Sequence, residues 1–315
     1  MIAVINIITT TITIITPTTK KVQKRKREKL KVTHGSRAKL NLFLDILHKR
    51  DDGFHEVETI IAPISLADNL IFRLTDKSKV KIYCTSDTLQ ESENIIYKIA
   101  CFLKDTYNVK HGVEIKLKKN IPLAAGLGGG SSNAAITIQV LNSLWKLKLS
   151  MADIHRTVSL FGSDINFFLE NRAAFLKGRG EIVRETFPAP YIENILLVNP
   201  GIEIASRNAY SWSVIGGLHK EMRSAMITGL NSNNIEMICD NLHNGLEQGV
   251  FAHYPILQEI KAQLLELGAM GSLMSGSGAT VFGIFPSREK LLNAKKYFNK
   301  YRYWLFETKI EQEAN

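Results

Sequence analysis

The stretch Ile121–Ala135, IPLAAGLGGGSSNAA, decides the reading of this chain, because four glycines and two serines lead into what looks like an apolar helix. Glycine lets the backbone adopt positive φ and lets a ligand approach the main chain closely. A loop that opens a helix also presents unpaired N–H groups at the positive end of the helix dipole, which favours phosphate. The stretch predicts an anion-binding loop, and a glycine-rich turn without a ligand is the simpler alternative only for an isolated GGG.

Composition indicates a globular protein whose positive charge gathers at one end. The 315 residues are 45% hydrophobic, which is enough to bury a large core in two domains or one large one. Residues 1–30 hold seven basic side chains and one acidic one, so this segment carries +6 of the total charge of +10. A basic block of this kind is more typical of a solvated tail than of a binding arm. We therefore expect no nucleic-acid partner.

The N-terminal run MIAVINIITTTITIITPTT precedes the basic block, which is the reverse of the order in a secretory signal peptide. It is also short and rich in hydroxyls for a membrane span. We expect residues 1–30 to be an extension outside the fold, with organelle targeting as a less favoured alternative and no membrane partner. Cys84, Cys101 and Cys239 form no CxxC pair, which argues against a zinc site or a disulfide framework and fits a reducing, cytoplasmic location.

Hydrophobic periodicity predicts strands that precede and interrupt helices without a regular βαβ alternation, so the expected class is α+β. We find no internal repeat. The first expected strand is residues 30–47, with its apolar alternation interrupted at HGSRAK. The other expected strands are HEVETIIAPI, DNLIFRLT, KVKIYC, GVEIKLKKN, a hairpin turned at 178–180, NILLVNPG, two strands in MGSLMSGSGATVFGIF, and 303–306. The expected helices are 94–107, 131–145, 151–161, 234–246, 255–267 and 288–299. Ser150 is the expected N-cap of the helix over 151–161.

Three familiar phosphate-binding patterns do not fit the loop. No GK[ST] occurs in the chain, which excludes the P-loop signature, and Ser131 stands where the Rossmann spacing requires its third glycine. The tripeptide HRT at His155–Thr157 lacks the catalytic aspartate of protein kinases. The loop therefore follows another pattern, which begins with a proline and ends with two serines. The serine hydroxyls can reach phosphate or Mg²⁺.

Four separated stretches together resemble the GHMP kinases, a superfamily of small-molecule kinases. They are SRAKLNLFLDILHKRDDGFHEVET (36–59), IPLAAGLGGGSSNAA, GSDINFF (162–168) and LMSGSGATVFGIF (273–285). The resemblance covers roughly residues 32–306 and is strongest to members that phosphorylate a cytidine-diphosphate sugar alcohol of the non-mevalonate isoprenoid pathway. It implies an N-terminal ATP-binding domain with a mixed sheet and helices over residues 31–172. It also implies a C-terminal α/β sandwich over residues 173–315, with the substrate cleft between the two.

The resemblance implies roles for two charged residues and for the glycine loop. Asp164 would be the general base for the acceptor hydroxyl, and Lys39 would keep that carboxylate ionised and stabilise the transferring phosphoryl group. Without the resemblance, the simpler interpretation of Lys39 is an exposed strand lysine, and that of Asp164 is a turn residue at the end of a helix. ATP and Mg²⁺ are the implied cofactors; the metal ligands stay open between Ser131, Ser132 and others. The expected ATP-binding residues are Pro122, Leu123, Ala124, Ala125, Gly126, Leu127, Gly128, Gly129, Gly130, Ser131 and Ser132.

A cytidine acceptor needs an aromatic platform and hydrogen bonds to the edge of the base. Phe54, His55 and Tyr210 are the candidates for this task, although half-buried packing is the simpler interpretation of Tyr210. Asn41 is a further candidate for substrate contact. The second glycine loop, formed by Ser275, Gly276, Ser277 and Gly278, is expected near the substrate phosphates, with a plain turn between strands as the alternative.

The chain departs from the family pattern at Arg37 and Asn166, where proline is usual, and neither replaces a side chain with an implied chemical role. Two other functions compete with the cytidyl-substrate kinase. One is another GHMP activity, such as a homoserine or mevalonate kinase, which the stretch 38–56 fits less well. The other is a basic nucleic-acid-binding protein with an incidental glycine loop, which the confinement of charge to the tail disfavours. The sequence predicts no particular oligomeric state.

Overall fold

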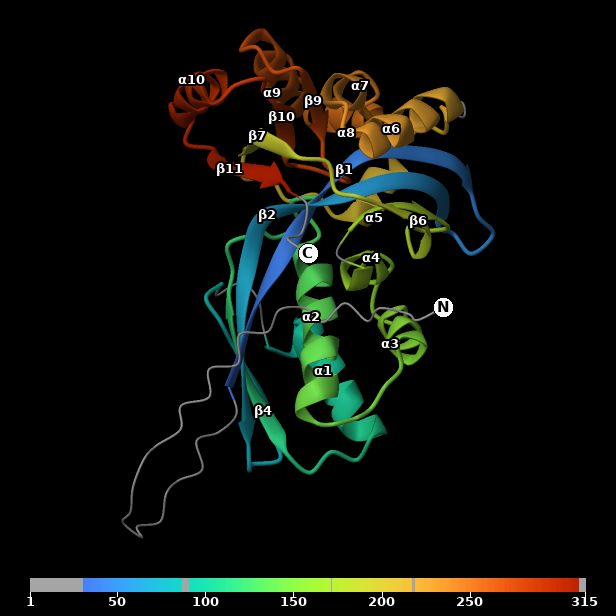
Figure 1. Ribbon diagram of the computed structural model, residues 1–315, viewed down its shortest axis with the longest axis vertical. Coiled ribbons are helices and arrows are strands. Elements are labelled where there is room, and N and C mark those ends of the chain that lie inside the picture. The colour runs from blue at the N-terminus through green and yellow to red at the C-terminus, as the bar shows by residue number, and fades with distance from the viewer. Residues whose placement is uncertain (1–30, 87–90, 171, 217–218, 312–315) are drawn as a thin grey trace.

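The computed structural model describes residues 31–86, 91–170, 172–216 and 219–311, and it is built around two long strands (Figure 1). Strand β1 (Lys31–Lys49) pairs antiparallel with β2 (His55–Thr75) along nearly its whole length. At about 3.3 Å per residue, each strand extends for roughly 60 Å. The pair therefore reaches through both halves of the molecule. The expectation for residues 1–30 lies outside the described residues.

The first sheet follows the order β3 (Val80–Cys84), β4 (Gly112–Lys118), β2, β1 and β8 (His243–Asn244), while β5 (Ala173–Lys177) pairs with β2 and β6 (Ile182–Phe187) with β5. The short helix η1 (Glu91–Glu93) follows β3 in the chain. Helices α1 (Ile95–Thr106), α2 (Gly129–Leu144), α3 (Met151–Val158) and α4 (Ile165–Glu170) gather on one side of this sheet (Figure 1). Their apolar faces bury Phe72 and Ile115 of the sheet with Ile99, Ile138 and Phe167 of the helices.

The second sheet is antiparallel, in the order β11 (Trp304–Ile310), β7 (Ile192–Asn199), β10 (Val281–Ile284) and β9 (Gly271–Met274). Helix α9 (Pro255–Glu266) packs on β9 and β10, and α10 (Arg288–Asn299) packs on β7. Leu40 and Ile60 of the first sheet share a buried cluster with Leu197 and Phe282 of the second, so the two sheets meet in a common core. The remaining helices are α5 (Ser206–Ser211), α6 (Lys220–Ser232), α7 (Ile235–Asp240) and α8 (Glu247–His253).

The mixed first sheet and the antiparallel second sheet confirm the α+β class. Most predicted elements form, including the Ser150 cap of α3 and the hairpin turned at 178–180. The predicted division at 172/173 stays a prediction; β5 and β6, just beyond it, hydrogen bond within the first sheet.

Several predicted boundaries are wrong for identifiable reasons. The predicted extended run over 30–47 forms as β1, and the interrupted alternation at HGSRAK coincides with a register shift between Arg37 and Lys39 inside the strand. Two predicted strands merge into β2, which stays paired with β1 throughout. The helix predicted over 234–246 ends at Asp240, since residues 243–244 pair with β1 instead. Helix α2 begins at Gly129, two residues before the prediction, and α3 ends at Val158 rather than at 161.

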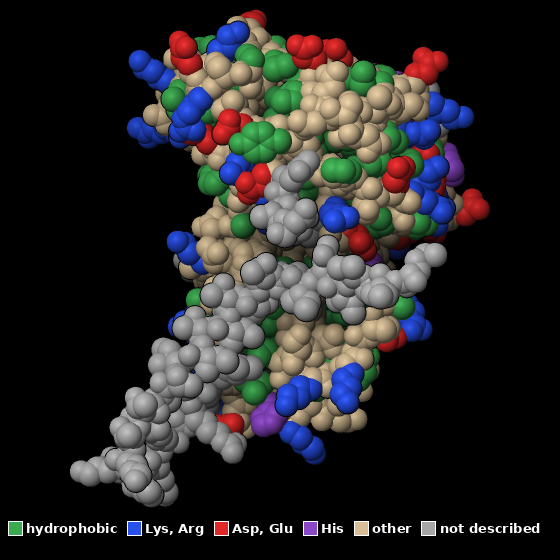
Figure 2. All heavy atoms as spheres, viewed as in Figure 1, with side chains coloured by type: hydrophobic (Ala, Val, Ile, Leu, Met, Phe, Trp, Pro, Cys, Tyr) green, Lys and Arg blue, Asp and Glu red, His purple; other side chains and the backbone are tan. Residues whose placement is uncertain are grey.

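Hydropathy and surface charge can be followed over the described residues. None of their helices combines the length and the apolar character that a membrane crossing requires. On the face drawn in Figure 2, Lys and Arg side chains are interspersed with Asp and Glu over the half that holds the second sheet. Among these visible side chains, the positive charge does not collect into a single patch.

A buried carboxylate fastens the end of β4 to the start of the glycine loop. Asp68 of β2 is fully buried and accepts hydrogen bonds from the backbone N–H groups of Asn120 and Ile121, at 2.7 and 2.9 Å. Its other oxygen lies 2.5 Å from Lys119 Nζ and 3.0 Å from Asn133 Nδ2 in α2. Four donors converge on one carboxylate, so both sides of the loop are fixed to the sheet.

We expect Asp68→Ala to lower the free energy of unfolding by about 3–5 kcal/mol, because it leaves the buried Lys119 ammonium and two backbone donors without an acceptor. Urea unfolding followed by circular dichroism measures the change. The exposed turn residue Asp51 is the matched control, and its replacement by alanine should stay within about 0.5 kcal/mol of the parent. Equal stabilities for the two variants would contradict the anchoring role of Asp68.

Candidate active site

The glycine loop leads directly into α2, as the sequence predicts, and leaves the end of the helix uncapped. Gly128 is the N-cap residue, with φ of 68° in the left-handed region, and it has no side chain to pair with the first amides of the helix. Gly126 also has positive φ, at 73°. The N–H groups of the first turn thus keep their capacity to bind an anion.

Lys39 lies beside this loop in the middle of β1 and is buried. Its backbone N–H donates to the carbonyl of Leu127 at 3.0 Å, and its ammonium donates to the carbonyl of Gly126 at 2.6 Å and to Asn41 Oδ1. Burial lowers the pKa of Lys39 to about 8 from its ordinary value of 10.5, and the negative charge of Asp164 partly opposes this effect. The loop therefore has a cation directly beneath it.

The second glycine loop, between β9 and β10, meets the first. Ser275 Oγ donates to the Gly126 carbonyl at 3.0 Å. A Cβ atom on Gly126 would lie 1.9 Å from the Ser275 carbonyl oxygen, so this close approach requires glycine. Asn244 of β8 donates to the carbonyls of Met274 and Gly276, at 2.7 and 2.8 Å, and so fixes the second loop to the first sheet.

Further residues of the second loop also have neighbours in the site. A Cβ atom on Gly276 would lie 3.0 Å from Lys39 Nζ and 3.0 Å from Asn41 Oδ1. The hydroxyls of Ser277 and Ser206 are 3.2 Å apart. Gly278 has positive φ and faces Met274. The predicted substrate residues of this loop are thus adjacent to Lys39 and to the first loop.

Asp164 precedes α4 and contributes a negative charge to the same region. Its charge raises the pKa of Lys39 against the effect of burial, and it adds to the effect of burial in raising the pKa of Tyr210 far above the ordinary value. Ser163 donates to Asp164 Oδ1 at 3.5 Å, and a Cβ atom on Gly180 would lie 3.6 Å from the same oxygen. Among the described residues, no ion pair within 4.0 Å joins Asp164 to Lys39, so the two interact across a gap.

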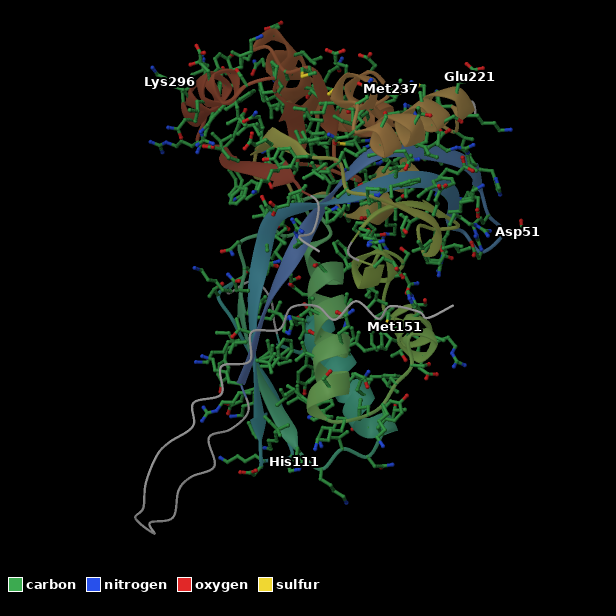
Figure 3. All side chains as sticks on the ribbon, viewed as in Figure 1. Asp51, His111, Met151, Glu221, Met237 and Lys296 are labelled. Atoms are coloured by element: carbon green, nitrogen blue, oxygen red, sulfur yellow. The ribbon has the colours of Figure 1, made fainter. Side chains whose placement is uncertain are left out.

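The predicted aromatic residues make two separate contacts near the tip of the β1–β2 hairpin, which Asp51 marks in Figure 3. The rings of His55 and Tyr210 stack with centroids 5.5 Å apart and an angle of 22° between their planes. Phe54 is 53% exposed, and the guanidinium of Arg179 lies 4.8 Å from the centre of its ring. Burial lowers the pKa of His55, with Lys49 adding to the effect, so this imidazole is neutral near pH 7.

A hollow of ≈ 310 Å³ adjoins the entrance to the glycine loop. Pro122 and Leu123 of the loop line it together with Trp304 from β11, and the other lining residues are Thr85, Ser86, Lys119, Asn120 and Ile121. The hollow is therefore bounded by the edge of the first sheet, the glycine loop and the second sheet.

The structure separates the predicted loop residues into two groups. The side chains of Ala125 and Leu127 are buried in the core, which leaves only their backbone to face a ligand. Ser132 is buried and shares a 2.7 Å hydrogen bond with Ser36, whereas Ser131 is half-buried. Of the two serines that the sequence left open, Ser131 is the more accessible.

The sequence did not reveal Asp68 and Arg179 as parts of the site. The stretch GRG between two strands was a signal for Arg179, since it places a cation in a hairpin turn. Asp68 gives no comparable signal, because its partners lie more than 50 residues further along the chain.

Both departures from the family pattern have hydrogen-bonded partners. Arg37 donates to the Ile64 carbonyl at 3.1 Å and to Glu311 at 3.2 Å. Asn166 donates to Ser159 Oγ at 3.0 Å and to the Glu181 carbonyl at 3.2 Å. The turn that carries Asp164 is thus held by side-chain hydrogen bonds where a proline ring is usual.

Comparison with known proteins agrees with this arrangement. Residues 94–170 match the GHMP kinases N terminal domain, and residues 223–303 match the GHMP kinases C terminal region. The 4-diphosphocytidyl-2-C-methyl-D-erythritol kinase of a Thermoanaerobacter species is 42% identical over 263 residues, which cover 82% of this chain and 89% of that protein. The enzyme of the same name from Clostridioides difficile is 37% identical over 85% of this chain and 91% of its own length.

Solved structures give the same result for the fold. A crystal structure of 4-(cytidine 5'-diphospho)-2C-methyl-D-erythritol kinase superposes with a TM-score of 0.74 at 28% identity, covering 89% of this chain and all of the other. Homoserine kinase from Cytophaga hutchinsonii, at 17% identity and a TM-score of 0.67 over 93% of this chain and 98% of that one, shares the fold alone. The expected two-part kinase fold is confirmed, and the chain belongs to the GHMP kinase family of small-molecule kinases.

Proposed function

We propose that this chain transfers a phosphoryl group from ATP to the 2-hydroxyl of 4-diphosphocytidyl-2-C-methyl-D-erythritol, in the non-mevalonate route to isoprenoid precursors. The observation that carries the proposal is the set of relatives of that name, which are 35–42% identical over more than four-fifths of this chain. The group formed by Phe54, His55, Tyr210 and Arg179 supports it, since an aromatic platform with a nearby cation suits a nucleotide acceptor.

ATP would bind with its phosphates over the uncapped end of α2 and its adenine in the hollow beside Trp304. The amides at Gly129, Gly130 and Ser131 would hold phosphate oxygens. The hollow is large enough for a nucleobase, and its walls combine apolar and polar side chains. The half-buried Ser131 hydroxyl suits Mg²⁺, which takes oxygen ligands and keeps phosphate oxygens and waters in its shell. When bound, Mg²⁺ neutralises charge on the transferring phosphoryl group.

Asp164 would accept the proton of the attacking hydroxyl. It lies close enough to Lys39 and Tyr210 to affect the pKa of both, and this supports a position facing the acceptor. Lys39 would contribute a positive charge to the transferring group, fixed in place by the Gly126 carbonyl and Asn41. Asn41 would then act on the substrate by orienting this lysine.

Asp164→Asn should lower kcat by about 100- to 10,000-fold while the Kd for ATP changes little, since an amide keeps the shape of the carboxylate but cannot accept the proton. Single-turnover kinetics measure the chemical step, and calorimetry measures ATP binding. Asp105→Asn, at an exposed position near the end of α1, is the control and should match the parent enzyme. Near-normal turnover in the Asp164 variant would assign the base to another residue.

The rate should also depend on pH through Lys39. Because its pKa is lowered to about 8, the free enzyme keeps the cation at pH 7 and loses it as the pH rises through 8. The value of kcat/KM, which reports ionisations of the free enzyme, should therefore fall about tenfold per unit well above that pH. Lys39→Arg should be slower but should lack this alkaline decline, since arginine stays charged. An unchanged decline in the arginine variant would show that another group titrates.

Acceptor selectivity tests the proposed substrate directly. A coupled assay of ADP release should give far higher kcat/KM for the cytidyl acceptor than for its uridyl analogue, homoserine or mevalonate. Cytosine presents a donor where uracil presents an acceptor, and each buried mismatch costs about 1–3 kcal/mol. Equal rates for the cytidyl and uridyl acceptors would reject the cytidine pocket, and activity on homoserine or mevalonate alone would reject the proposed function.

Two variants, measured in the same assay, separate recognition of the edge of the base from stacking on its face. His55→Ala should reduce the preference for cytidine, because the neutral imidazole can bond the edge of the base. Phe54→Ala should weaken both acceptors alike, because stacking is largely indifferent to base identity.

A further inference from the structure

Three side chains far apart in the sequence meet on the side of β1 that faces the start of α6. Asp45 lies in β1, His243 begins the short strand β8, and His219 is the N-cap residue of α6. One ligand atom from each lies within 4.8 Å of the other two. The two imidazole rings are 4.1 Å apart between centroids, and Asp45 is almost completely buried.

Hydrogen bonding accounts for only part of this cluster. Asp45 accepts from the backbone N–H of His219 at 2.9 Å and lies 3.2 Å from His219 Nδ1. His243 Nε2 is buried and has no hydrogen-bond partner, and at 3.7 Å from Asp45 Oδ1 it is too far away to form one. A buried nitrogen without a partner costs free energy unless something binds it. His243 Nε2 thus faces the Asp45 carboxylate without forming a hydrogen bond to it.

We propose that Asp45, His219 and His243 bind one divalent transition-metal ion, and that Zn²⁺ is the ion their donor set fits. Imidazole nitrogen with a single carboxylate oxygen suits zinc and its neighbours and disfavours Mg²⁺ and Ca²⁺, which take oxygen ligands. Tetrahedral ligands at about 2.1 Å from zinc are about 3.4 Å apart. The two separations from Asp45 Oδ1, 3.2 and 3.7 Å, lie on either side of that spacing.

The exposure of the three residues matches an ion that enters from solvent. The side chain of His219 is 36% exposed and that of His243 is 21% exposed, while that of Asp45 is 4% exposed. The ion can therefore reach the cluster past the histidines and keep a water in its fourth position.

The ion would join three elements that hold the active site in place. His243 is followed by Asn244, whose amide bonds two carbonyls of the second glycine loop. Asp45 lies four residues beyond Asn41 on the same strand. Helix α6 carries Arg223, which forms an ion pair with Glu58 of β2. A metal ion at this position would link α6 to β1 and β8, at a distance from the phosphate loop. The proposed metal site does not depend on the identity of the phosphoryl acceptor.

The cluster contains no cysteine, so the wide spacing of the cysteines has no bearing on it. The competing interpretation is a metal-free group in which Asp45 acts only as an acceptor of hydrogen bonds, from the backbone N–H of Ile46 at 3.1 Å and from His219. Both interpretations allow the histidines to support stability, and only the first requires that Zn²⁺ bind.

Zinc titration of the full chain distinguishes the metal site from the metal-free interpretation. The protein is freed of metal with a chelator and titrated calorimetrically with Zn²⁺ in the presence of excess Mg²⁺, which occupies oxygen sites. We expect one ion per chain and a rise in the unfolding temperature. His219→Gln and His243→Gln should each weaken zinc binding by at least about 100-fold, because loss of a ligand exceeds the effect of losing an outer-shell partner. His48→Gln, at an exposed position of the same strand, should bind as the parent does.

Cobalt gives a second readout that does not depend on stability. Co²⁺ bound in a four-coordinate site absorbs strongly in the visible range, and that absorption should appear in the parent and be absent from both histidine variants. The proposal is overturned if the parent chain binds no zinc ion, or if the two histidine variants bind it as tightly as the His48 variant does. Retained binding in His48→Gln with loss in the other two supports it.

Discussion

The arrangement of the site depends on one buried ammonium group, that of Lys39. Removing a lysine from water disfavours its charged form, and the lowered pKa records that cost. The cost is offset by hydrogen bonds to the Gly126 carbonyl and to Asn41. Ser275 of the second glycine loop donates to the same Gly126 carbonyl. The Gly126 carbonyl oxygen therefore accepts hydrogen bonds from both β1 and the second glycine loop, and it fixes the first glycine loop to each of them.

The long β1–β2 hairpin explains how one element can serve several parts of the site. Lys39 and Asn41 lie in the middle of β1, and the hairpin turn presents Phe54 and His55 to the aromatic group. Because the two strands are paired almost throughout, these side chains keep fixed spacings along one rigid frame. Rigid positioning of this kind is what phosphoryl transfer mainly asks of a protein.

Local patterns in the sequence predicted most of the fold, because strands, caps and glycine turns are local features. Ser150, the glycine loop and the 178–180 turn all formed where expected. Helix α6 was missed. Strand β8 was missed because its two residues form a strand only by pairing with β1. Within the site, Asp68 could not be recognised, since it acts on residues 51–65 positions away. Asp45, His219 and His243 lie still further apart along the chain, and only the folded chain brings them together.

The glycine at the N-cap of α2 has a consequence for the whole protein. A serine or aspartate there would stabilise the helix by itself, whereas Gly128 leaves that task to whatever anion occupies the loop. If the proposed nucleotide fills the loop, it would act as part of the folded structure, and by mass action the folded population would rise with its concentration. A chain without bound nucleotide would then unfold more often and be more open to proteases.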